Sequence, residues 1–110
     1  MPEIVTEKFL NGKSADVGQL TESGWVAWEV HLPTSCRSNL IAEMVAKDLR
    51  AGFVMVVICV LSAKDVEKVK AVVVEMDANL GLFGLSASVA SRVEVKLLSD
   101  FLEPNGGLKS

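Results

Sequence analysis

The chain has 110 residues, of which 50% are hydrophobic and 23% are charged, and its formal net charge is −3. A length of this order predicts one domain, and the acidic balance supplies no overall field that would attract nucleic acid. No run of about 18 apolar residues is present, so we expect no membrane insertion.

In the first third of the chain, alternation and turn residues predict two strands. Residues 3–10 alternate loosely and stop at the turn pair Asn11-Gly12, which indicates a first strand. Residues 14–20 favour a short helix, although a glycine inside it lowers its propensity. Residues 25–32 alternate cleanly and form the second strand, with Trp25, Ala27, Glu29 and His31 on one face.

The remaining two thirds predict a long connection, a central strand, a helix and a last strand. Residues 33–52 form the connection, which we expect to be mobile, although its second part has the spacing of a helix. The nine apolar residues 53–61 are typical of a strand that is covered on both faces. Residues 62–65 form an S-x-x-D capping box at the start of a helix, and residues 85–97 favour the last strand. The tail over 103–110 has no periodicity, and we expect it to be flexible.

This order predicts an α+β fold of the ferredoxin-like βαββαβ type. Right-handed crossovers would give a four-stranded antiparallel sheet with both helices on one face, in a single domain with its core over residues 3–98. The mean hydropathy of +0.38 and a bare second sheet face predict a homo-oligomer. The start Met1-Pro2-Glu3 lacks the regions of a secretory signal, so we expect a cytoplasmic protein.

The single histidine excludes a metal site built on several histidines of one chain, and we predict no catalytic residue. Glu29 and His31 share a strand face and Cys36 follows, so these three residues are a candidate transition-metal set. The alternative is an ordinary half-exposed strand face. Cys59 lies in the apolar run and is interpreted as a small core residue.

A second candidate site is an anion site that uses the cations of the connection and the last strand. No phosphate-binding loop of a familiar type is present in the sequence. In an oligomer these cations would meet at a subunit cleft, whereas each alone would be solvated surface charge. The candidate effector-binding residues are Arg37, Lys47, Arg50, Arg92 and Lys96.

The layout resembles the PII-like signalling proteins, small βαββαβ chains with a long loop between strands 2 and 3. Residues 22–30 are similar to the end of the first helix and the second strand of that family, 33–52 match its loop in length, and 53–81 match its third strand and second helix. Residues 40–45 are similar to divergent members associated with metal efflux or transporters. The resemblance implies a non-catalytic homotrimer that binds an anionic effector, with an adenine nucleotide as the candidate, and signals to a partner protein through the loop.

Three alternatives remain open from the sequence. A structural oligomer, such as a microcompartment shell-type protein, is one. A PII-like protein that binds a metal through Glu29, His31 and Cys36 is another. A small dimeric α+β enzyme is the third, and it is disfavoured because the sequence offers no clear pair of acid and base groups.

Overall fold

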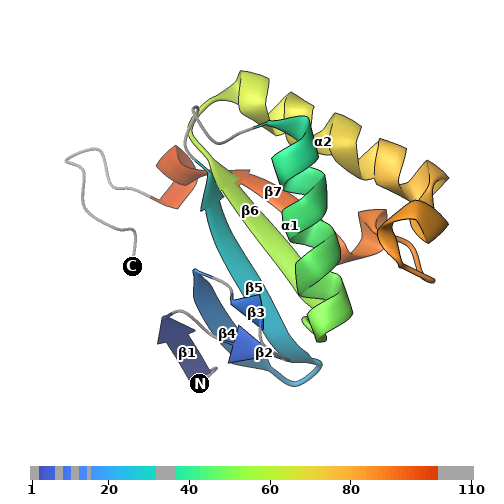
Figure 1. Ribbon diagram of the computed structural model, residues 1–110. Coiled ribbons are helices and arrows are strands. Elements are labelled where there is room, and N and C mark those ends of the chain that lie inside the picture. Colours follow the sequence, from blue (N-terminus) through green and yellow to red (C-terminus); the bar gives the residue numbers. More distant parts are fainter. Residues whose placement is uncertain (1–2, 7–8, 11–12, 15, 32–36, 102–110) are drawn as a thin grey trace.

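The computed structural model describes residues 3–6, 9–10, 13–14, 16–31 and 37–101, with side chains for 16–31 and 37–99 (Figure 1). The elements are, in chain order, strands β1 (Glu3–Thr6), β2 (Phe9–Leu10), β3 (Lys13–Ser14), β4 (Val17–Thr21) and β5 (Gly24–His31), helix α1 (Ser38–Ala51), strand β6 (Met55–Val60), helix α2 (Ala63–Ala78), the 3-10 helices η1 (Leu80–Phe83) and η2 (Ala90–Arg92), strand β7 (Val93–Leu97) and the 3-10 helix η3 (Leu98–Phe101).

The main sheet has five strands in the order β1-β4-β5-β6-β7, and β2 and β3 form a separate two-stranded sheet. The pairs β1–β4 and β4–β5 are antiparallel, whereas β5–β6 and β6–β7 are parallel. The sheet is therefore mixed. An antiparallel half is joined at β5 to a parallel β5-α1-β6-α2-β7 half.

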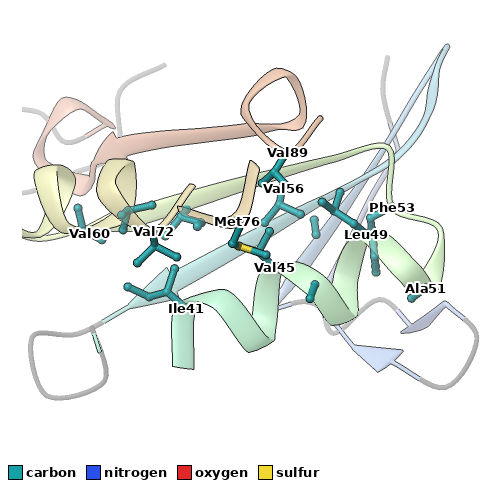
Figure 2. Packing of buried hydrophobic residues seen from close by; sticks show 14 residues of the cluster. Ile41, Val45, Leu49, Ala51, Phe53, Val56, Val60, Val72, Met76 and Val89 are labelled. Atoms are coloured by element: carbon teal, nitrogen blue, oxygen red, sulfur yellow. The ribbon is translucent and has the colours of Figure 1, made fainter. Parts of the chain in front are cut away.

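Both helices cover the same face of the sheet (Figure 1). Each parallel crossover moves one strand further in the same direction, and right-handed crossovers of that kind place their helices on one side. Figure 2 shows Ile41, Val45 and Leu49 of α1 pointing toward the layer that holds Met76 of α2 and Val56 of β6. These five side chains are at most 6% exposed, so this layer is the main core of the protein.

A smaller apolar cluster lies on the opposite sheet face. Val26 of β5 and Val57 and Cys59 of β6 are buried there, and Trp28 packs against them. Trp25 packs against the main core instead. The predicted alternation of residues 25–32 and the interpretation of Cys59 as a core residue are therefore confirmed.

The predicted helix over residues 14–20 is wrong, because strand β4 begins at Val17 and pairs with β5 from Val17↔Trp28 to Thr21↔Gly24. A seven-residue window holds too few turns for helical spacing to be distinguished from a strand, and Gly18 disfavours a helix. The tight link to β5 uses Gly24, whose φ of +130° few residues other than glycine adopt.

The described residues do not form the expected four-stranded antiparallel sheet. Residues 38–51 of the expected mobile connection form helix α1, which turns the link between β5 and β6 into a parallel crossover. The expected last strand is also shorter, since pairing begins only at Val93. The expected fold class is confirmed, since the fold is α+β with two helices on one face of an open sheet.

Two local expectations have different outcomes. Ser62 caps α2 as predicted, because its Oγ accepts the Asp65 N–H at 3.2 Å. The tail over 103–110 and the polar stretch 33–36 lie outside the described residues. Among the helices that the structure describes, none combines the length and the hydropathy that crossing a membrane requires.

Candidate functional site

Two carboxyl groups face each other between the sheet and the first helix. Glu29 of β5 lies on the same strand face as Ala27, which belongs to the main core. Asp48 of α1 comes three residues after Val45 and seven after Ile41 in the apolar stripe of that helix, so it too is turned toward the sheet. Glu29 is 5% exposed and Asp48 is 2% exposed. Acidic side chains are seldom buried to this extent without a partner, and this pair is therefore the starting point of the site.

The electrostatics of the pair are dominated by burial. Burial raises the pKa of the Asp48 carboxyl to about 9, and a hydrogen bond to Glu29 and the negative charges of Glu29 and Asp16 act in the same direction. Asp48 is therefore protonated at neutral pH and shares its proton with Glu29, because two adjacent buried carboxylates repel each other. Within the described part of the chain, Oδ2 of Asp48 has no hydrogen-bond partner.

A third acid, Asp16, connects this pair to the surface. It directly precedes β4, and the register Val17↔Trp28 places it beside Glu29. The Asp16 N–H donates to Oε1 of Glu29 at 2.9 Å, and Oδ2 of Asp16 accepts the Val30 N–H at 3.0 Å. Asp16 is exposed. The three acids thus form a path from solvent to a buried carboxyl at the carboxyl end of β5, and we call Asp16, Glu29 and Asp48 the acidic site.

His31 lies two residues beyond Glu29 on the same face of β5, as the alternation predicted. Its Nδ1 is buried and has no hydrogen-bond partner among the described groups. Cys36, the third member of the predicted metal set, lies outside the described residues. In the part of the chain that the structure describes, no three His, Cys, Asp or Glu side chains are already arranged to hold a metal ion.

The five predicted effector cations do not meet within one protomer. Arg37 is exposed just before α1, and Lys47 pairs with Glu43 one turn away on the same helix. The Arg92 guanidinium donates to the carbonyl oxygens of Ser88 and Ala87 at 2.9 and 2.8 Å, which ties it to its own loop. Lys96 is 3.7 Å from Glu94 on β7.

Two of the predicted cations line grooves: Lys96 lines one between α2 and β7, and Arg50 lines another. This groove, of about 540 Å³, runs between α1, α2 and η1, and Glu43 and Glu75 also line it. The Arg50 side chain lies across Gly84, where a Cβ would come within 3.2 Å of its Cδ. With two acids beside one cation, the groove does not form a concentrated anion site.

The sequence predictions missed Asp16 and Asp48. For Asp48 a signal was present, since an acid spaced three residues after Val45 and seven after Ile41 lies on the apolar face of the helix. For Asp16 there was none, because its position beside Glu29 depends on the pairing of β4 with β5.

Comparison with protein-family models gives no match to this chain. Neither the curated proteins nor the solved structures give a match. The functional argument therefore depends on the geometry of the site.

Proposed function

We propose that this protein binds a divalent cation at the acidic site. The observation that carries the proposal is the buried Asp48 carboxyl, whose Oδ2 has no hydrogen-bond partner among the described residues although it adjoins Glu29 and the charge of Asp16. Buried charges in proteins are generally paired or coordinate a metal ion. A cation between Glu29 and Asp48 would replace the shared proton and satisfy the unpartnered oxygen.

The chemistry of these groups favours Mg²⁺ or Mn²⁺. Carboxylate oxygens suit these hard ions, whereas a thiolate would favour softer ones. The described side chains do not already form a three-residue metal group. Mg²⁺ commonly takes only one or two protein carboxylates and completes its shell with water and with the phosphate oxygens of a ligand. An incomplete protein shell is therefore consistent with an ion that also binds an anionic ligand.

This proposal changes how an anionic effector, such as a nucleotide, would be held. The predicted cations are dispersed, so the positive charge that receives the phosphate would come from the bound ion. The role that we propose is binding, without a chemical reaction. The signalling role implied by the PII-like resemblance is compatible with it, although the parallel pairing of β5, β6 and β7 does not match the ferredoxin-like sheet of that family.

A second candidate places the effector on Arg50, because this residue lines the groove between the two helices. In that case a nucleotide would bind without a divalent ion. No described residue favours the structural-oligomer alternative or the small-enzyme alternative over these two.

Calorimetric titration with Mn²⁺ and Mg²⁺ tests the proposal. We expect one ion per chain, and we expect Glu29→Gln to weaken binding by about tenfold or more, since it removes a charged ligand. Glu43→Gln is the matched control, because Glu43 is an exposed acid on α1 outside the acidic site. Its affinity should equal that of the wild type.

The proposal fails if the wild type gives no heat with either ion, or if Glu29→Gln and Glu43→Gln bind equally well. ATP titrated with and without Mg²⁺ separates the two candidates. Binding of ATP that needs the ion supports the acidic site, and binding without it that is lost in Arg50→Ala supports the groove.

A further inference from the structure

Strand β7 lies at an edge of the main sheet. It pairs with β6 on one side, and no described strand pairs with its other side. Val93, Val95 and Leu97 pack toward the main core, so the alternating Glu94 and Lys96 lie on the other face. An edge strand with unpaired backbone groups is a template for pairing with another chain.

The charges of β7 are complementary to those of a second β7 that runs in the opposite direction. If a two-fold axis passes through Val95, Glu94 of one copy lies opposite Lys96 of the other, and the same pair forms again on the other side of the axis. Shifting the axis to Glu94 or Lys96 would place that residue opposite its own copy, and like charges directly opposite are destabilising. The sequence of β7 therefore favours one self-complementary register.

The surface beside β7 has the apolar character that such a contact needs. A groove of about 550 Å³ lies between α2 and β7, and Val73, Val74, Val93 and Val95 contribute to its lining. Val74 is 70% exposed although it is a large apolar side chain. When two sheets join edge to edge across a two-fold axis, both sets of helices lie on the same face. The α2 helices of the two copies would then lie side by side and cover these valines.

We propose that two copies of this chain form a dimer through antiparallel pairing of their β7 strands, with the two-fold axis at Val95. The two sheets become one continuous sheet, and the paired α2 helices close the apolar groove. This interface is independent of the acidic site, because β6 separates β7 from β5 in the sheet order.

Charge reversal on β7 tests the inference through the oligomeric state. Lys96→Glu gives four acids at the interface and Glu94→Lys gives four bases, so each single variant should dissociate at least about tenfold more readily than the wild type. The double variant Glu94→Lys/Lys96→Glu exchanges the charges and restores complementarity, and it should dimerise like the wild type. An equimolar mixture of the two single variants should form a heterodimer.

The measurement is light scattering after size-exclusion chromatography over a concentration series, with circular dichroism to confirm folding. Lys47→Glu is the control, because it makes the same charge change on α1, and it should remain dimeric. A wild-type monomer at micromolar concentration would overturn the inference, as would the homotrimer implied by the PII-like resemblance. Single variants that dimerise as tightly as the double variant would overturn the β7 register.

Discussion

At the scale of residues, the Asp48–Glu29 pair is the most informative contact of the protein. An acid held protonated between a helix and a sheet contributes to stability in a way that depends on pH. The pKa of Asp48 is about 9 in the folded chain, against an ordinary value of 3.8. The folded state therefore holds a proton more tightly than the unfolded state, and the stability that this proton contributes is lost as the pH rises between these values.

This direction of the pH dependence of stability gives a prediction for the protein in a buffer that contains a chelator. Urea unfolding between pH 5 and 8 should show a free energy of unfolding that falls as the pH rises, by at most about 1.4 kcal/mol per pH unit for one group. Asp48→Asn, which keeps the shape and removes the titration, should flatten this dependence and raise stability at pH 8. Stability that is independent of pH in the wild type, or that rises toward pH 8, would argue against the shared proton.

The control for that experiment is Glu43→Gln. The pKa of the Glu43 carboxyl is lowered by its hydrogen bond to Lys47 and by the charge of that lysine. Its titration therefore falls below pH 5, where it leaves the slope between pH 5 and 8 unchanged. Equal slopes for Glu43→Gln and the wild type, with a flatter slope for Asp48→Asn, assign the effect to the buried pair.

At the scale of elements, the sequence predicted best where one pattern extended over many residues. The long apolar run gave β6, the Ser62 cap gave the start of α2, and the alternation of residues 25–32 gave both faces of β5, including the placement of Glu29. The prediction failed at β4, where a seven-residue segment fits either period and the pairing with β5 decided the outcome. That error also concealed Asp16, so one of the three acids of the acidic site depended on a tertiary contact.

The interior position of β6 gives a prediction for the folding of the whole sheet. Val57 is 3% exposed and lies between β5 and β7. Val57→Asp should abolish folding, since an unpaired buried carboxylate costs several kcal/mol against a total stability of roughly 5 to 15 kcal/mol. Val74→Asp is the matched control, because Val74 is mostly exposed, and this variant should keep the circular dichroism of the wild type. A folded Val57→Asp protein would contradict the assignment of β6 as a buried interior strand.

At the scale of the whole molecule, β5 joins two halves with different strand directions. It pairs antiparallel with β4 and parallel with β6, and its carboxyl end carries Glu29 and His31. The acidic site takes one acid from the segment before β4 and one from α1, so both halves contribute to it. The proposed dimer uses the β7 edge, which β6 separates from β5, and it leaves the exposed Asp16 of this site uncovered. Substitutions on β7 that weaken the dimer should therefore leave cation binding unchanged, and substitutions in the acidic site should leave dimerisation unchanged.

Diffraction from crystals soaked with Mn²⁺ tests the central claim most directly, because the anomalous signal locates the ion without reference to any assay. The account predicts a peak at the carboxyl end of β5, within a coordination distance of about 2.0 to 2.6 Å from a carboxylate oxygen of Glu29 and from one of Asp48 or Asp16. The same soak of Glu29→Gln should show a weaker peak there or none. Wild-type crystals without a peak at the acidic site, or with an equal peak in Glu29→Gln, would contradict the claim that these acids bind a divalent cation.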